Sequence, residues 1–385
     1  MLRYHRSSNL DFRKDFTLPK ILDFLDSSFD IKKSESIKSS DIFIIEPLLL
    51  PSKDSITQYI DSIVKNHGKD HKLVIWHPAE LYHWALNSFV INALEAHEYP
   101  PENVFTVSGD YYKPSQPKYF LPENILYFPY FAYKTSQLNL PEKVEYKNKK
   151  KFILPIYSPR PARRYLLHYL DKANLLDLGH VSCTREETLL FDDSLNGAQW
   201  ILPAEEVKQV YESTLKLVPA TENNFSPTEP LVLDRNNIQV SESWNHSDLM
   251  STLTDFYRSS DFVISPESSV NFVGRGTEPT GFITEKTFIP IMLNMPFVIH
   301  GEKHSLKSLQ DQGYETFYNY IDESYDNADD IYTRTTRLID TVNNMCYIED
   351  WNMIKDIVEH NRNHMLNVGY KACLDEIFEK ILGVN

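Results

Sequence analysis

Glycine, cysteine and long apolar runs are all scarce in this sequence, and each shortage excludes a class of protein. Only 11 of the 385 residues are glycine, which argues against collagen-like and glycine-rich architectures. The three cysteines, Cys183, Cys346 and Cys373, form no CxxC pair and no zinc-ligand spacing, so we expect reduced thiols. No apolar run approaches the ~18 residues of a transmembrane helix, and the N-terminus lacks the apolar core of a signal peptide. These absences predict a cytoplasmic protein without a membrane span.

Basic charge is also in short supply. The chain has 39 Lys and Arg against 54 Asp and Glu, which gives a formal net charge of −15. Such a chain repels the phosphate backbone of nucleic acids, so DNA is an unexpected partner, although a local basic cleft would still allow it. The nucleotide-binding patterns GxxxxGKS and GxGxxG are absent, which argues against P-loop ATPases, kinases and dehydrogenases.

Short apolar runs alternate with helical patterns along the chain, which is typical of parallel sheets built from βαβ units. In the first half, buried strands are expected at 41–50, 72–78, 103–110 and 125–133. A lysine-rich stretch, KNKKK at 147–151, then marks a change of composition before a new strand begins. At 385 residues the chain is also too long for one ordinary core.

The predicted fold is therefore α/β, with two doubly wound, Rossmann-like domains that face a cleft and a helical C-terminus. We expect the first domain at 1–148 and the second at 149–345. The helices of 346–385 can pack back on the first domain. In the second domain, a helix from Arg163 is expected to close at Gly179. Ligands of such sheets bind beyond the carboxyl ends of the strands, so polar side chains at those ends become candidates for a site.

An acid and a base stand side by side where the helix of 285–294 is expected to begin. Thr284 is suited to cap this helix, so Glu285 and Lys286 would lie in its first turn. A lysine at the positive end of a helix dipole is unfavourable by roughly a few tenths of a kcal/mol. An ordinary solvated first turn is one interpretation. The other is a phosphate site made by backbone N–H groups and the ammonium, and Glu267, which ends the preceding strand, favours it.

The residues around this helix resemble a known motif. The stretch that runs from FVISPESS to GFITEKTFIPIMLNMPFVIHG, residues 262–301, resembles the donor-binding motif of α-1,3-fucosyltransferases and their phage and bacterial relatives. That motif consists of an apolar strand ending in Glu-Asn or Glu-Ser, a loop, the sequence ITEK, an apolar helix and a Pro-led strand. Glu267, Glu285 and Lys286 match its acidic and lysine positions.

A second match lies upstream, in ILPIYSPRPARRYLLHYL at 153–170, which is similar to the strand, turn, arginine and leucine-rich helix of the same family. The resemblance implies that one arginine reaches the donor pyrophosphate. Arg163 and Arg164 fit the spacing to the following leucines equally well, so both are candidates, and the other arginine of the pair is expected to face solvent. The strong resemblance covers roughly residues 150–320.

The resemblance implies a GT-B glycosyltransferase. A nucleotide diphosphate sugar, with a GDP-sugar favoured, would bind the C-terminal domain through the matched residues and Thr284. A hydroxyl acceptor, expected to be a glycan, would bind the N-terminal domain. The family's chemistry implies inversion at the anomeric carbon and no cofactor or bound metal, because Lys and Arg neutralise the departing diphosphate. The chain has no convincing Asp-x-Asp run in a strand–loop setting, which agrees with this expectation.

An inverting transfer requires a general base for the acceptor hydroxyl, normally a carboxylate of the N-terminal domain. Glu80, in WHPAE just past the expected strand of 72–78, is one candidate, and Asp110, in SGDYY, is the other. Glu80 would otherwise be an ordinary residue at a helix start. Two further functions stay open: sugar transfer to a modified DNA base, and a non-catalytic module that binds a nucleotide or a carbohydrate. An intact base would separate the enzyme from the module.

His360 and His364 lie four residues apart and would share one face of a helix, where they could in principle bind a metal. Asn361 stands where an HExxH motif has its glutamate, and no third ligand is evident nearby. We therefore predict a solvated helix face at this pair.

Overall fold

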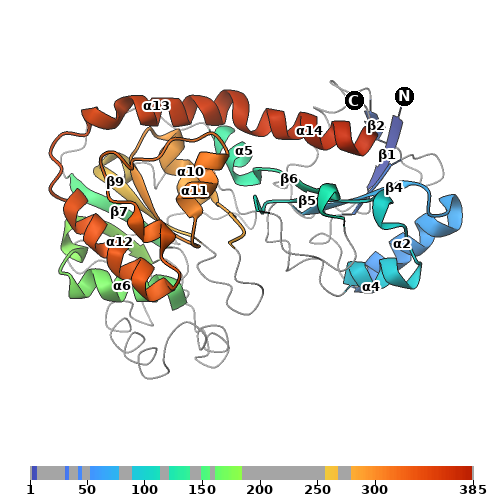
Figure 1. Ribbon diagram of the computed structural model, residues 1–385, viewed down its shortest axis with the longest axis horizontal. Coiled ribbons are helices and arrows are strands. Elements are labelled where there is room, and N and C mark those ends of the chain that lie inside the picture. The colour runs from blue at the N-terminus through green and yellow to red at the C-terminus, as the bar shows by residue number, and fades with distance from the viewer. Residues whose placement is uncertain are drawn as a thin grey trace, which may run out of the picture. The chain divides into compact units, whose positions relative to one another are not determined.

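The computed structural model describes residues 2–6, 31–33, 42–45, 53–77, 89–112, 121–138, 149–156, 161–183, 256–267 and 279–383. Within these ranges the strands form two parallel sheets with helices between the strands, and only helices and turns follow the last strand (Figure 1). The predicted α/β class is thereby confirmed, and this layout is consistent with the expected GT-B fold. None of the helices in these ranges is both long and apolar enough to cross a membrane.

The chain divides into two compact units. Met1–Lys134 and Gly369–Asn385 make up the first unit, and Thr135–Val368 makes up the second. From the sequence we predicted domain boundaries after residues 148 and 345. The chain returns to the first unit within a π-helical turn, Met365–Gly369. Which unit binds which substrate stays a prediction.

The first unit is built on a six-stranded sheet with the order β2-β1-β3-β4-β5-β6. The strands are β1 (Leu2–Arg6), β2 (Ile31–Lys33), β3 (Ile42–Ile45), β4 (Lys72–His77), β5 (Val104–Ser108) and β6 (Ile125–Tyr127). All the pairs are parallel, and the register places Phe43 beside Leu73 and Val74 beside Phe105. Apolar side chains fill both faces, which is why these strands read as continuous apolar runs in the sequence.

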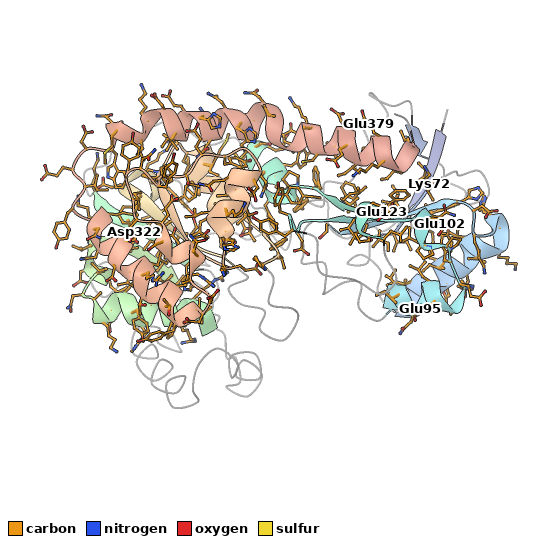
Figure 2. All side chains as sticks on the ribbon, viewed as in Figure 1. Lys72, Glu95, Glu102, Glu123, Asp322 and Glu379 are labelled. Carbon is orange, nitrogen blue, oxygen red and sulfur yellow. The ribbon has the colours of Figure 1, made fainter. Side chains whose placement is uncertain are left out.

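Helices cover both faces of this first sheet. Helices α2 (Lys53–His67) and α4 (Phe89–Ala96) pack on one face. On the other face, α14 (Tyr370–Leu382) buries its apolar side chains, Leu374, Ile377, Phe378 and Ile381, against the strands. The ammonium of Lys72, which is labelled in Figure 2, donates to the Ile381 carbonyl at the end of α14. The last helix of the chain therefore completes the core of the first unit.

The strand predicted at 125–133 is wrong beyond Tyr127. Strand β6 ends there, and helix α5 (Tyr130–Ser136) begins after Pro129. A proline cannot donate to a strand ladder but suits the start of a helix, and the Tyr133 N–H donates to the Pro129 carbonyl over 3.0 Å. The aromatic side chains that suggested a strand instead pack into the core, where the Phe128 and Trp76 rings lie 5.7 Å apart.

The second unit is built on a four-stranded parallel sheet with the order β10-β9-β7-β8. The strands are β7 (Lys150–Ile156), β8 (Gly179–Cys183), β9 (Ser260–Pro266) and β10 (Phe297–His300). Helices α6 (Pro161–Lys172) and α12 (Ile331–Met345) pack together on one face, and α10 (Glu285–Met292) and α13 (Lys355–His364) pack together on the other (Figure 1). Helix α11 (Ser305–Asp311) follows β10.

Short 3₁₀ turns complete the described chain. They lie at Pro101–Asn103, Pro122–Asn124, Leu176–Leu178, Ser324–Asn327 and Asn352–Ile354. The helix expected to close at Gly179 ends earlier, at Lys172, and Gly179 opens β8 instead. A Cβ atom at Gly179 would lie 2.2 Å from the Phe152 ring. Glycine is therefore required here by close packing on a neighbouring strand, not by a helix end.

Candidate functional site

The second sheet has a switch point between β7 and β9. From β7 the chain goes on to β8 on one side, whereas β9 and β10 lie on the other side. Ligands of open parallel sheets bind beyond the carboxyl ends of strands at such a point. Helix α6, which follows β7, brings Arg163 and Arg164 to this edge, and Glu267 directly follows β9. The topology thus gathers residues that are about 100 positions apart in the sequence.

Helix α10 begins at this edge as predicted. Thr284 has an extended backbone (φ −108°, ψ −178°), and its hydroxyl accepts a hydrogen bond from the Lys286 N–H over 3.5 Å. Thr284 is therefore the N-cap, and Glu285 and Lys286 lie in the first turn, which confirms the expected placement of all three residues. The N-terminus of an α-helix presents free N–H groups and a partial positive charge, so this turn can accept an anion.

Glu267 ties the start of this helix to the sheet. Its carboxylate is buried and accepts three hydrogen bonds: from the Thr284 N–H at 3.2 Å, from the Thr284 hydroxyl at 2.5 Å and from the Thr287 hydroxyl at 2.7 Å. Its own N–H donates to the His300 carbonyl of β10 over 3.0 Å. Since both carboxylate oxygens already accept from the protein, Glu267 fixes the position of α10. A direct contact with a nucleotide sugar stays a prediction for this residue.

Lys286 is held at the positive end of α10. Its side chain is 14% exposed, and its ammonium lies 2.6 Å from the Glu285 carboxylate and 3.2 Å from the Thr284 hydroxyl. Its carbonyl accepts from the Ser265 hydroxyl on β9 over 3.0 Å, which fixes the backbone as well. A largely buried cation beside one carboxylate at the positive end of a helix would gain from a second anion there.

The segment that leads into α10 is anchored from the next strand. Glu302 lies shortly after β10. Its carboxylate accepts hydrogen bonds from both the N–H and the hydroxyl of Thr280, each over 2.8 Å. The Ser308 hydroxyl of α11 donates to the Gly281 carbonyl over 3.1 Å, and Gly281 has a positive φ of 66°. Sequence reasoning missed Glu302, although an acid two residues after a Pro-led strand at this edge was a usable signal.

Both arginines of the predicted pair are buried, Arg163 with 3% and Arg164 with 8% of its surface exposed. The prediction that one of them faces solvent is therefore wrong, because the start of α6 is packed beneath other parts of the unit. The guanidinium of Arg163 donates to the Glu267 carbonyl over 3.5 Å. This contact places Arg163 on the same side as the start of α10.

Two further cationic or titratable residues at this edge were not predicted. His300, the last residue of β10, is fully buried, and its Nε2 lies 3.0 Å from the Thr335 hydroxyl. Burial, and then the charges of Arg334 and Arg163, lower the pKa of His300 to about 3, so the imidazole is neutral at physiological pH. Arg334 of α12 donates to the carbonyls of Gly301 at 3.1 Å and Ala328 at 2.8 Å. Arg334 thus closes the carboxyl end of β10.

Of the two candidate bases, Asp110 belongs to the described residues and Glu80 lies outside them. Asp110 follows β5 at the carboxyl edge of the first sheet and is buried, and its N–H donates to the Ser108 hydroxyl over 3.1 Å. The adjacent Tyr111 ring meets Tyr127 edge to face at 5.1 Å. A buried carboxylate beside aromatic rings suits a base that faces a sugar, and this role stays a prediction.

The histidine pair on α13 lies on a partly solvated face: His360 is exposed, as predicted, whereas His364 is partly buried. The His360 and His364 rings stack at 6.0 Å, and their Nε2 atoms lie 3.1 Å from the Gly313 carbonyl and 2.8 Å from the Gln312 carbonyl. Both imidazoles therefore hold the C-terminal end of α11. Across the described ranges, no group of three or more His, Cys, Asp or Glu residues is placed to hold a metal ion.

Comparisons with known proteins give two distant likenesses. No protein-family model and no curated protein matches the sequence. The structure is similar to T4 phage BGT in complex with UDP and Mn2+, with 12% identity, a TM-score of 0.40 and 99% of each chain covered. It is also similar to the catalytic domain of starch synthase IV from Arabidopsis thaliana bound to ADP and acarbose, with 10% identity, a TM-score of 0.38, and 89% of this chain and 73% of that chain covered. Neither protein is a fucosyltransferase by name. At these scores the likenesses carry no argument about activity, which rests on the residues of this chain.

Proposed function

We propose that this protein is a glycosyltransferase that binds a nucleotide diphosphate sugar at the carboxyl edge of the second sheet. One observation carries the proposal: the starts of α6 and α10 meet at the switch point, joined through Glu267. The carbonyl of Glu267 accepts from Arg163, and its carboxylate accepts from Thr284. Two helix N-termini and the cations Arg163 and Lys286 therefore lie at the same edge of the sheet. Diphosphates are recognised by this combination of N–H groups, dipoles and cations.

The chemistry of sugar transfer explains why such a site is useful. Negative charge grows on the diphosphate as the glycosidic bond breaks, and preorganised cations stabilise that charge most when water is excluded. Lys286 and the arginines would supply this stabilisation without a metal ion. Glu267, Glu302 and Ser265 would hold the cationic groups in place, because their hydrogen bonds fix the backbone of the α10 start.

We further propose that the enzyme inverts the anomeric carbon and uses a GDP-sugar as donor and a glycan hydroxyl as acceptor, as the ITEK resemblance implies. In this scheme the first unit binds the acceptor. Asp110 or Glu80 removes the proton of the acceptor hydroxyl as it attacks the sugar opposite the departing diphosphate. Thr284 and Glu285 would help to bind the donor beside Lys286.

A thermal-shift screen against GDP-, UDP-, ADP- and CMP-sugars tests the proposal. A nucleotide diphosphate sugar at 100 times its Kd should stabilise the protein by about 2.7 kcal/mol, whereas a CMP-sugar, which has a single phosphate, should have little effect. The best donor is then assayed for release of its nucleotide with and without glycan acceptors. Stabilisation without any turnover would favour a non-catalytic binding module, and no stabilisation by any donor would refute the site.

A further inference from the structure

The imidazole of His300 is partnered on one side and lacks a partner on the other. Its Nε2 faces the Thr335 hydroxyl at 3.0 Å. Its Nδ1 is buried and has no hydrogen-bond partner within the described residues. A buried polar atom without a partner is unfavourable, so an unpaired nitrogen in a native core calls for an explanation. Strand β10 places this nitrogen at the carboxyl edge of the sheet, next to the proposed diphosphate site.

The surroundings of the imidazole determine which role Nδ1 can play. The nearby charged groups that influence His300 are two guanidinium groups, Arg334 from α12 and Arg163 from α6. Burial, and then the charges of these two cations, lower the pKa of the ring and keep it neutral, so one ring nitrogen carries a hydrogen and the other accepts. Guanidinium groups donate hydrogen bonds and never accept them. If the imidazole hydrogen is on Nε2 and points at the Thr335 hydroxyl, Nδ1 is a hydrogen-bond acceptor. The charged groups that act on the ring, Arg334 and Arg163, are both donors.

Arg334 and Arg163 contact different backbone groups near His300. The guanidinium of Arg334 donates to three backbone carbonyls, at 2.8, 3.1 and 3.5 Å. The contact of Arg163 with the Glu267 carbonyl is 3.5 Å long, at the outer limit of a hydrogen bond. Glu267 is also the residue whose N–H donates to the His300 carbonyl. Glu267 therefore links Arg163 and His300 at the same pair of strand ends, and the charge of Arg163 acts on the ring.

We propose that His300 Nδ1 accepts a hydrogen bond from the Arg163 guanidinium, directly or through one water, and thereby aims this cation at the diphosphate. His300 is then a positioning residue, which acts on the ligand through Arg163. The effect on ligand binding rests on the proposed function, whereas the contact between the two side chains does not. Because the ring stays neutral, its role is independent of pH across the physiological range.

The first test replaces His300 with two amides, each of which places a polar atom near only one of the two ring nitrogens. Asparagine can place its side-chain oxygen near the position of Nδ1, whereas glutamine reaches the position of Nε2. With inorganic pyrophosphate and GDP as probes in calorimetry, His300→Gln should weaken binding about tenfold, and His300→Asn should weaken it less. Thr341→Val is the matched control, since it removes a buried hydroxyl of the same helix that donates to the Asp322 carbonyl instead of facing His300, and it should leave affinity unchanged. Equal affinities for wild type and His300→Gln would overturn the proposal.

The second test needs no ligand. In protein labelled with ¹⁵N-histidine, the Nδ1 resonance of His300 reports the hydrogen bond that this atom accepts, and Arg163→Lys should shift it while Arg164→Lys should not. An unchanged resonance in Arg163→Lys would overturn the proposal and assign Nδ1 to Arg334 or to an isolated water. If wild-type protein binds no probe, the diphosphate site is refuted, and the ¹⁵N experiment still decides whether His300 holds Arg163.

Discussion

The two units contain sheets of the same parallel kind, but they differ in the side chains that they bury. Within the described part of the first unit, Asp110 is the one buried side chain of a charged type. The described part of the second unit buries six side chains of charged types. They lie around its sheet edge and in the following turns: Arg163, Arg164, Glu267, Glu302, Asp326 and Arg334. Burying a charged group is unfavourable unless hydrogen bonds and partners compensate. The second unit therefore holds several buried charged groups in place at one edge of its sheet, as a site for a charged ligand requires.

The first unit has the opposite character at its edge. Its described strands are apolar on both faces, and the carboxyl edge after β5 presents one acid with neighbouring tyrosines. Such a surface suits a neutral, hydroxyl-rich ligand such as a sugar better than a diphosphate. The two edges would therefore divide the reaction between them, with charge stabilised in one unit and a proton removed in the other.

The largest effect should come from Asp110, the buried acid in the described part of the first unit. Asp110→Asn keeps the shape of the side chain and removes its basicity, so turnover should fall about 10²–10⁴-fold while donor affinity stays nearly unchanged. Steady-state transfer assays and calorimetry on the same variant separate the two quantities. Glu80→Gln is the comparison: if this variant is inactive and Asp110→Asn is normal, Glu80 is the base. Normal rates in both variants would remove the catalytic role of this unit.

A smaller effect is expected when the polar edge of the second unit is disrupted. Glu267→Ala leaves three donors on Thr284 and Thr287 without their acceptor, which should lower the free energy of unfolding by about 3 kcal/mol. Urea unfolding of the second unit measures this change. Glu95→Ala, on the exposed face of α4 in the first unit (Figure 2), is the control and should change stability by less than about 0.5 kcal/mol. Equal stabilities of both variants would contradict the structural role of Glu267.

The units should also differ in their response to pH. Burial, the dominant cause, raises the pKa of Glu323 from 4.5 to about 7 and that of Asp326 to about 6. The folded state therefore holds these protons more tightly than the unfolded state. The resulting stabilisation is complete below the unfolded pKa and is lost as pH rises through the folded values. Between pH 5 and pH 8 the second unit should lose roughly 2 kcal/mol from Glu323, and Glu323→Gln should abolish that loss in urea titrations. An unchanged pH slope in the variant would contradict this account.

Local patterns explain what could be predicted about the second unit from sequence. Thr284 as a cap, Glu285 and Lys286 in the first turn and the Pro-led strand after them are all set by neighbouring residues. The hydrogen bonds of Glu267 and the burial of Arg163, His300 and Arg334 depend on residues far apart in sequence. Only the order of the strands brings them together, so no local pattern could reveal them.

The errors have the same origin. The aromatic run after Ile125 fits a strand by composition, but Pro129 and the packing of Phe128 decide for a helix. Gly179 looks like a helix end, yet its need for glycine comes from Phe152 on a neighbouring strand. His364 looks exposed on its own helix and instead binds a carbonyl at the end of α11. In each case the local preference of the residue was judged correctly, but a contact with a distant part of the chain decides the structure.

The most direct test of the diphosphate site is calorimetry of GDP, UDP, ADP and inorganic pyrophosphate with wild-type protein and with Lys286→Ala. Losing a charge-assisted hydrogen bond to phosphate should weaken binding by about 1.5–3 kcal/mol, which is about 10–150-fold. Lys307→Ala, an exposed lysine of the same unit that pairs with Asp311, is the control and should bind as wild type does. The account predicts a loss confined to Lys286→Ala, shared by pyrophosphate and the preferred nucleotide. Unchanged affinity in Lys286→Ala would contradict it and place the phosphates elsewhere.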